Sequence, residues 1–437
     1  MKIKELKNKK VLILGIGREG VDSFVFLRHI FPKQVLFIAD KKKFEDLSVD
    51  TKKLLKDKKV ELFLGEDYLR NIKGFDIIIK SPGILLSSIK KYLSKRTKVT
   101  SQTELFFDNC PGMIIGITGT KGKSTTSSLI YSVLKEAGMK SYLVGNIETP
   151  SLSFLLNAKK EDIFVYELSS HQLQSLEKSP HIGLFLNVYL EHLDYYKNFK
   201  EYFLAKANIV KYQKKDDYFV FNSKIKEIKN LAEKAKSKKI EINADDFSKF
   251  LKNNQEFLEI THIDNLVAAL NVFKILGIKE EKIIKAFKKF KRPAHRLEFI
   301  GEYNGIRFYD DSISTIPEAA IFALDSLGND VETLIVGGFD RGIKHGKLAE
   351  RIVKSKVKNL ILFNPSGERI LKEVEKREGK VKHVFVGNME DAVKKCFQKT
   401  SAGKICLLSP ASPSFGTFVD YKDRGEQFKK FIIKYGK

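Results

Sequence analysis

The sequence predicts an α/β protein of three domains, each built on a sheet whose strands alternate with helices. Short apolar runs of strand length recur along the chain and are separated by stretches with helical spacing, which is typical of parallel or mixed sheets. The chain is also 437 residues long, more than one hydrophobic core usually holds, because domains contain roughly 100 to 200 residues. We expect the domains at residues 1–108, 109–297 and 298–437.

The first domain begins with a glycine-rich turn between a strand and a helix. The strand 10–14 enters the turn, and a second strand, 34–39, ends in Asp40. This spacing is the fingerprint of a Rossmann-like domain, whose glycines let a pyrophosphate approach the backbone. A later strand, 75–80, brings Ser81 to the same sheet edge. The ligand stays open between NAD or FAD, a smaller nucleotide such as a UDP-sugar, and none. The glycines are Gly15, Gly17 and Gly20.

The second domain contains the most specific motif, an apolar run followed by a glycine-rich turn, Lys123 and a helix from Thr125. Exposed backbone N–H groups, a lysine and a helix N-terminus together bind nucleotide phosphates, and the Ser124 hydroxyl can ligate Mg²⁺. Ile117 stands where a standard P-loop has its first glycine. The motif predicts ATP binding on a central mixed sheet of P-loop ATPase type. The predicted loop contacts are Gly119, Thr120, Gly122, Lys123, Ser124 and Thr125.

Three further side chains of this domain are candidates for metal binding or catalysis. Glu167 ends a strand beside the loop, where a carboxylate holds Mg²⁺ directly or through water. His192 follows the strand 182–188 and is either a site residue or a hydrogen-bonded loop histidine. Lys206 interrupts the amphipathic stretch 199–210, and by pattern alone it is a surface lysine whose stem packs on apolar neighbours.

The third domain again alternates strands and helices, with polar turns at the strand ends. Asp311 and Arg341 follow two of these strands, and each is either a contact for an amino acid or ribose or an ordinary surface residue. Before the domain, Arg296 suits bidentate phosphate binding, and Asn265 lies where it can donate to a phosphate or base. The predicted strands are 298–303, 305–309, 333–336, 360–363, 383–386 and 404–408.

The composition is strongly basic, with 79 Lys and Arg against 54 Asp and Glu. The lysines are spread along the chain, which favours solvated helix faces and attraction for an anionic substrate over nucleic-acid binding. Cys110, Cys396 and Cys406 have neither metal spacing nor a disulfide pattern, and no apolar run reaches the roughly 20 residues that span a bilayer. We therefore expect a soluble, cytoplasmic monomer with no nucleic-acid or membrane partner.

Eight groups of residues make the whole chain resemble the Mur ligase family. The ATP-side motifs are specific to the superfamily, and the last motif with the short N-terminal domain points to the branch that adds D-glutamate. The motifs are Gly-Ile-Thr-Gly-Thr-Lys-Gly-Lys-Ser (116–124), Gly-Asn-Ile (145–147), Glu-Leu-Ser-Ser-x-Gln-Leu (167–173), Glu-His-Leu-Asp (191–194), Ala-Lys (205–206), His-Arg-x-Glu (295–298), Asp-Asp-Ser (310–312) and Leu-Ser-Pro-Ala-x-x-Ser-Phe (408–415) with Tyr421 and Asp-Arg-Gly (423–425).

The resemblance implies an ATP-dependent, Mg²⁺-dependent ligase that joins D-glutamate to UDP-N-acetylmuramoyl-L-alanine through an acyl phosphate. The alternative within the family is a sister ligase that adds another amino acid to a related cell-wall precursor. Two rival functions come from other classes of protein. A nicotinamide-dependent oxidoreductase would use the first glycine turn but would give Lys123 and Glu167 no role. A nucleic-acid-binding ATPase should hydrolyse ATP faster when nucleic acid is added.

The resemblance also implies roles for individual residues of this chain. Lys123, Glu167, His192 and a carbamylated Lys206 are the implied catalytic residues, and the last three hold metal ions with Ser124. Asn265, Arg296 and Asp311 contact the nucleotide. Gly17, Asp40 and Ser81 hold the UDP end and Asn146 the muramoyl part, while D-glutamate meets Thr315, Arg341, Ser414, Phe415 and Tyr421. Four positions depart from the family pattern: Glu148, His262, Ile313 and Arg341.

Overall fold

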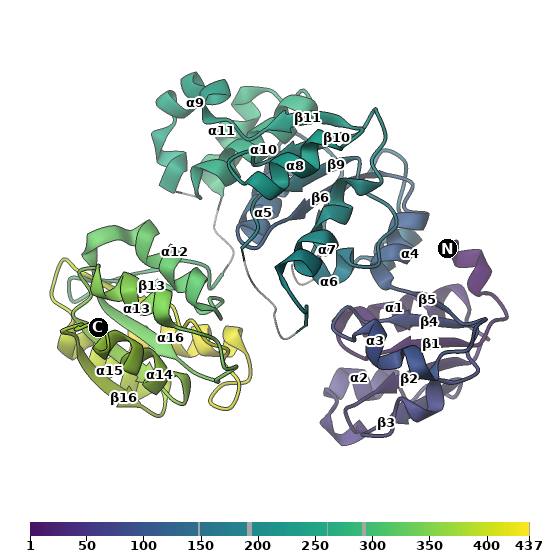
Figure 1. Ribbon diagram of the computed structural model, residues 1–437, viewed down its shortest axis with the longest axis horizontal. Coiled ribbons are helices and arrows are strands. Elements are labelled where there is room, and N and C mark those ends of the chain that lie inside the picture. The colour runs from purple at the N-terminus through teal and green to yellow at the C-terminus, as the bar shows by residue number, and fades with distance from the viewer. Residues whose placement is uncertain (147–148, 190–194, 260, 291–293, 437) are drawn as a thin grey trace. The chain divides into compact units, whose positions relative to one another are not determined.

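The computed structural model describes residues 1–146, 149–189, 195–259, 261–290 and 294–436. Contacts between Cα atoms divide the chain into a first unit, Met1–Phe290, and a second unit, Lys291–Lys437. The first unit contains two sheets and the second unit one (Figure 1). The chain is therefore an α/β protein with three sheets, as predicted, whereas the three domain boundaries remain predictions.

The first sheet has five parallel strands in the order β3-β2-β1-β4-β5. Buried side chains from both faces of β1 lie in two separate apolar clusters, with Val11 and Ile13 in one and Leu12 and Leu14 in the other. This burial on both faces is why the strands read as continuous apolar runs. The elements are β1 (Val11–Leu14), α1 (Arg18–Ile30), β2 (Leu36–Asp40), α2 (Val49–Leu54), β3 (Val60–Leu64), β4 (Ile77–Lys80), α3 (Leu86–Ile89), β5 (Lys98–Thr100) and α4 (Gln102–Asn109).

The second sheet has six strands in the order β11-β10-β9-β6-β8-β7, and all pairings between its described residues are parallel. Our prediction of a mixed central sheet was therefore wrong. The elements are β6 (Met113–Thr118), α5 (Lys123–Glu136), β7 (Ser141–Gly145), β8 (Ile163–Glu167), α6 (Ser170–Leu173), β9 (Ile182–Phe185), α7 (Phe199–Lys211), β10 (Tyr218–Phe221), α8 (Lys226–Glu233), β11 (Lys238–Glu241), α9 (Ser248–Asn253), α10 (Ile263–Ile275) and α11 (Glu280–Lys289).

Two predicted boundaries in this sheet shift for local reasons. Helix α5 begins at Lys123, two residues earlier than expected, because Gly122 adopts φ +84° as its N-cap. Strand β9 ends at Phe185, three residues earlier, because the following backbone instead bonds the ATP loop, with Tyr189 N donating to Thr120 Oγ1 at 2.9 Å.

The third sheet, in the second unit, is mixed, because β12 pairs antiparallel with β13 while the other strands run parallel in the order β12-β13-β17-β14-β15-β16. All six predicted strands are present, with ends within two residues of those expected. The elements are β12 (Glu298–Tyr303), β13 (Ile306–Asp310), α12 (Pro317–Leu327), β14 (Val331–Gly337), α13 (Gly346–Val353), β15 (Asn359–Phe363), α14 (Ser366–Glu375), β16 (Lys382–Val386), α15 (Met389–Lys399), β17 (Ile405–Leu408) and α16 (Tyr421–Tyr435).

Among the helices that the structure describes, none has both the length and the apolar character that crossing a lipid bilayer requires.

Candidate functional site

The glycine-rich loop between β6 and α5 is held in shape by the segment after β9. Thr120 N donates to Asn187 O at 3.0 Å, Lys121 N donates to Asn187 Oδ1 at 2.8 Å, and Asn187 Nδ2 donates back to Lys121 O at 3.1 Å. Gly122, the N-cap of α5, has no side chain that could cap the helix, and the first N–H groups of a helix attract anions.

Gly122 is required where the loop enters α5. Its φ of +84° disfavours other residues, and a Cβ there would lie 2.8 Å from Asn265 Cγ. Asn265, predicted to contact the nucleotide, therefore lies against the loop, although it is 143 positions further along the sequence. Its Nδ2 donates to Thr261 Oγ1 at 3.1 Å.

Lys123 and Lys206 meet at one backbone oxygen of the loop. Lys123 Nζ donates to Gly119 O and Thr120 O, both at 3.0 Å. Lys206 Nζ, on α7, donates to the same Gly119 O at 2.9 Å and lies 4.9 Å from the ring centre of Tyr202. Lys206 is 2% exposed, so the interpretation of Lys206 as a surface lysine was wrong. Two amines beside the loop suit an anionic substrate.

Glu167, at the end of β8, is almost completely buried beside Asn146. Asn146 Nδ2 donates to Glu167 Oε1 at 3.0 Å. Glu167 Oε2 is inaccessible to solvent and has no hydrogen-bond partner in the described part of the chain. A buried, unpartnered carboxylate oxygen is costly unless a cation reaches it. This observation fits a divalent metal, with Glu167 and Ser124 as oxygen donors; His192 lies outside the described residues.

Lys123, Asn146 and Lys206 line one cavity of the first unit, with a volume of about 290 Å³. It brings together three predicted site residues and adds several that the sequence analysis assigned no role. Of these, Glu19 and Gln172 lie inside motifs that were already recognised, whereas Tyr202 had no sequence signal. The lining residues are Glu19, Pro82, Gly83, Lys123, Asn146, Ser169, Ser170, His171, Gln172, Tyr202 and Lys206.

The predicted UDP residues lie together at the turn between β1 and α1. Ser81 Oγ donates to Gly15 O at 3.1 Å, and a Cβ at Gly15 would lie 2.6 Å from this hydroxyl. Asp40 accepts from Ile16 N at 2.7 Å and from Lys42 N at 2.8 Å. Asp40 and Ser81 therefore shape the turn, while the space around Gly17 is open.

The second unit holds the other predicted nucleotide contacts, Arg296 and Asp311. Burial raises the pKa of Asp311 to about 6, against hydrogen bonds from Ser314 and Ser409 and the nearby charge of Arg296, which lower it. Leu297 N donates to Asp311 Oδ1 at 3.2 Å. The hydrogen bond from Leu297 to Asp311 thus joins the end of β13 to the segment before β12, which contains Arg296.

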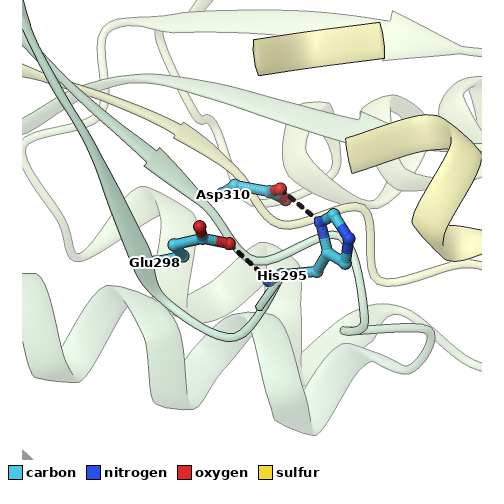
Figure 2. Close-up of side chains that lie close together, drawn as sticks. All are labelled: His295, Glu298 and Asp310. Carbon is cyan, nitrogen blue, oxygen red and sulfur yellow. Dashed lines mark hydrogen bonds and ion pairs between the residues drawn. The ribbon is translucent and has the colours of Figure 1, made fainter. Parts of the chain in front are cut away.

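His295, directly before Arg296, is fixed by an acidic pair (Figure 2). Its Nδ1 lies 2.7 Å from Asp310 Oδ2, and its backbone N donates to Glu298 Oε2 at 2.7 Å. His295 has φ +62°, and a Cβ at Gly425 would lie 2.8 Å from His295 Cε1. Since His295 and Asp310 bond each other, we interpret the hydrogen bonds among His295, Glu298 and Asp310 as a structural support that orients Arg296.

The predicted D-glutamate residues are partly brought together near the ends of β14 and β17. The Arg341 guanidinium lies 5.9 Å from the ring centre of Phe415, which also contacts the ring of Phe339. Ser414 is buried next to Phe415. Tyr421 begins α16 and its O accepts from Ser312 Oγ at 2.8 Å. The last predicted residue, Thr315, lies in the loop before α12.

Comparisons with known proteins agree with this geometry. Sequence models match at residues 117–304, described as the Mur ligase middle domain, and at residues 295–412, described as the Mur ligase, glutamate ligase domain. A UDP-N-acetylmuramoylalanine–D-glutamate ligase from Acetivibrio thermocellus is 35% identical over 98% of this chain and 97% of its own length. The enzyme of the same name from Clostridium acetobutylicum is 32% identical, with the same coverage.

Solved structures of similar fold are more distant in sequence. UDP-N-acetylmuramate–alanine ligase from Thermotoga maritima matches with a TM-score of 0.58 and 15% identity over 98% of this chain and 99% of that chain. The MurF ligase from Thermotoga maritima in complex with ADP has a TM-score of 0.56 and 18% identity, over 84% of this chain and 91% of that chain. A bifunctional folylpolyglutamate synthase/dihydrofolate synthase with Mn, AMPPNP and L-glutamate bound has a TM-score of 0.52 and 13% identity, over 72% and 90%.

Proposed function

Because this chain belongs to the Mur ligase family, we propose that it joins D-glutamate to UDP-N-acetylmuramoyl-L-alanine at the expense of ATP, in the synthesis of peptidoglycan precursors. The relatives named for this activity align with 98% of the chain, which favours it over a sister ligase with another amino acid. We further propose that Mg²⁺ is the divalent metal, that the chain acts as a monomer, and that residues 1–108, 109–297 and 298–437 form the three domains.

The observation that carries this proposal is the arrangement of two lysines and a buried carboxylate around one loop. Lys123 and Lys206 both donate to Gly119 O, and Glu167 leaves one oxygen unpartnered among the described residues. Phosphoryl transfer depends on positioning and charge neutralisation, with little covalent work for the protein. The cavity supplies both, next to N–H groups that suit phosphates.

The first chemical step is attack of the substrate carboxylate on the γ-phosphorus of ATP. A carboxylate oxygen bonds phosphorus as the bond to the leaving oxygen of ADP breaks, which gives an acyl phosphate. Lys123 and the first turn of α5 hold the phosphates and stabilise the charge that develops on their oxygens. Carbamylation of Lys206 would replace its amine by an anionic ligand, which with Glu167, Ser124 and His192 would hold a divalent metal; the metal would then supply the neutralisation that the amine supplies in the unmodified chain.

The second step forms the amide. The uncharged amine of D-glutamate attacks the acyl carbon, phosphate leaves, and the amine loses one proton to solvent. We assign Arg341 to a carboxylate of D-glutamate and Phe415 to its carbon chain, because these side chains lie together. We assign Arg296 and Asp311, which belong to the second unit, to nucleotide contacts, and the segment fixed by His295 orients Arg296.

The test is phosphate release from ATP by the purified protein with Mg²⁺, UDP-N-acetylmuramoyl-L-alanine and one amino acid at a time. D-Glutamate, L-glutamate, L-alanine and a diamino acid are compared. We expect release with D-glutamate alone and a loss of at least 100-fold in Lys123→Ala, since one electrostatic contact to the transition state contributes about that factor. Lys135→Ala, an exposed lysine in the last turn of the same helix, serves as the matched control.

Turnover with another amino acid only would keep the mechanism and replace D-glutamate. Release that needs no acceptor substrate, or that nucleic acid stimulates, would contradict the ligase proposal.

A further inference from the structure

Glu19 is an acidic residue at the N-terminus of α1, where the proposed function predicts groups that bind the anionic UDP substrate. It lies in the first turn of α1, two residues after Gly17, where the helix N-terminus and the glycine turn suit a diphosphate. The same side chain lines the cavity that contains Lys123 and Lys206. A charged carboxylate here would repel the substrate that this cavity is proposed to hold.

The contacts of Glu19 leave one oxygen for a ligand. Its Oε1 accepts from Gln172 Nε2 at 2.7 Å. Its Oε2 is inaccessible to solvent and has no hydrogen-bond partner in the parts of the chain that the structure describes. Leaving a carboxylate oxygen buried without a donor is unfavourable, whereas a protonated carboxyl has an O–H to donate.

Lys80 is the neighbouring cation, but its hydrogen bonds go to backbone oxygens and not to Glu19. Lys80 Nζ donates to Ser81 O at 3.0 Å and to Ile84 O at 2.7 Å. The other charged or titratable groups of the described residues whose fields reach Glu19 or that line the same cavity are Arg18, Asp22, Lys123, Tyr166, His171, Tyr202 and Lys206.

The environment of Glu19 favours its neutral form. Burial raises the pKa of Glu19 to about 7, against the hydrogen bond from Gln172 and the charge of Lys80, which lower it. Burial also lowers the pKa of Lys80 to about 8. Near neutral pH, the free protein therefore contains both forms of Glu19.

We propose that Glu19 binds the UDP-muramoyl substrate in its protonated form: its side chain turns to bring the buried Oε2 to the cavity, and Oε2 donates a hydrogen bond to an anionic oxygen of that substrate. The oxygen belongs either to the diphosphate or to the terminal carboxylate, because the cavity lies between the glycine turn and the ATP loop. Substrate binding then takes up a proton. The inference rests on the proposed function and adds a specificity-determining residue to it.

The test measures proton uptake on binding by isothermal titration calorimetry in buffers of different ionisation enthalpy, at pH 6, 7 and 8. UDP-N-acetylmuramoyl-L-alanine carries a diphosphate diester and a carboxylate, neither of which titrates in this range. With a free pKa of about 7 and a fully protonated complex, we expect uptake of about 0.9 proton at pH 8 and a Kd about tenfold higher at pH 8 than at pH 6. UDP-N-acetylglucosamine, which lacks the carboxylate, identifies which oxygen Glu19 meets.

Two variants and a control separate this role from a structural one. Glu19→Gln keeps an N–H donor without a titrating proton, so at pH 6 and 7 its proton uptake is expected to be absent and its Kd to be the same. Burial lowers the pKa of Lys80 to about 8, so uptake that remains in this variant at pH 8 is assigned to Lys80. Glu19→Ser also lacks the titrating group. If Glu19→Gln does not fold, Glu19→Ser tests whether proton uptake is lost. Glu61→Gln, the same change at an exposed position of β3, is expected to behave as the unsubstituted protein.

Binding without proton uptake, or uptake that persists in Glu19→Gln at pH 7, would overturn the assignment of Glu19 and leave the proposed function intact. Failure of the folded protein to bind UDP-N-acetylmuramoyl-L-alanine at any pH would overturn both.

Discussion

Individual residues around the ATP loop differ in how visible their roles are in the sequence. Lys123 and Ser124 are recognisable from their spacing after a glycine turn, and the structure places both in the first turn of α5. Lys206 has no such spacing, and its own stretch predicts a surface residue. Its contact with Gly119 O joins positions 87 apart in the chain, which local periodicity cannot reveal.

Gly122 gives a residue-scale prediction. Gly122→Ala is expected to destabilise the protein by about 1 to 2 kcal/mol because of its φ of +84°. It is also expected to weaken ADP binding at least tenfold, since the added Cβ displaces Asn265 and the loop. Urea unfolding and calorimetric titration with ADP measure the two effects.

Gly138→Ala is the matched control for this change. Gly138 follows the other end of α5 with φ +78°, and a Cβ there would meet no atom within 4 Å. We expect a similar loss of stability with unchanged ADP affinity. Equal loss of ADP affinity in both variants would contradict the steric argument.

At the scale of elements, strand positions were predictable and their pairing was not. Apolar runs located the central strands of the sheets, such as β1, β4 and β6, because these strands are buried on both faces, whereas β3, β5, β10 and β11 were not predicted. The direction of each strand depends on which neighbour it pairs with. The antiparallel pair β12 and β13 has a two-residue connection that only antiparallel strands can use, whereas the lysine-rich stretch after β9 gave no signal that β10 and β11 run parallel.

Helix α1 shows how an element joins two sheets of the first unit. Asp22 Oδ2 accepts from Gln102 Nε2 at 2.9 Å, Leu152 N at 3.0 Å and Ser153 N at 3.3 Å, and Oδ1 accepts from Ser153 Oγ. One carboxylate thus satisfies four donors from α4 and from the segment after β7. Because α1 follows the glycine turn directly, these hydrogen bonds of Asp22 also fix the turn relative to the second sheet.

Asp22→Ala gives the element-scale prediction. Removal of the carboxylate leaves buried donors without an acceptor, and we expect a loss of about 2 to 4 kcal/mol in the free energy of unfolding of the first unit. Urea unfolding measures the loss. Asp50→Ala, an exposed acid in the first turn of α2, is expected to change the free energy of unfolding by less than about 0.5 kcal/mol. Equal effects of the two changes would contradict the network.

For the whole molecule, the sequence predicted three sheets but not how the chain divides into compact units. Glu19 and Gln172 are 153 positions apart and bond each other, so the first two sheets form one unit of contacts. This joint depends on side chains that meet only after both sheets have folded, and no periodicity marks them. The residues proposed to contact ATP belong to both units, with Lys123 and Asn265 in the first and Arg296 and Asp311 in the second.

The division gives a prediction for the whole chain. UDP-N-acetylmuramoyl-L-alanine at 100 times its Kd is expected to stabilise the first unit by about 2.7 kcal/mol and to leave the second unit unchanged, because the residues proposed to bind it all belong to the first unit. Hydrogen exchange followed by mass spectrometry in urea reports each unit separately. UDP-N-acetylglucosamine at the same saturation is the comparison ligand. Equal protection of both units would contradict this assignment.

The clasp between Asn187 and Lys121 has a consequence for inhibitor discovery. Two hydrogen bonds between these residues and a third from Thr120 N to Asn187 O fix the loop backbone through protein atoms alone, so the loop needs no nucleotide to hold this shape. A small phosphate mimic does not have to order the loop, so the free-energy cost of ordering does not reduce its affinity. Fragment screening can therefore begin with the nucleotide-free enzyme, with pyrophosphate as the competitor that marks genuine hits.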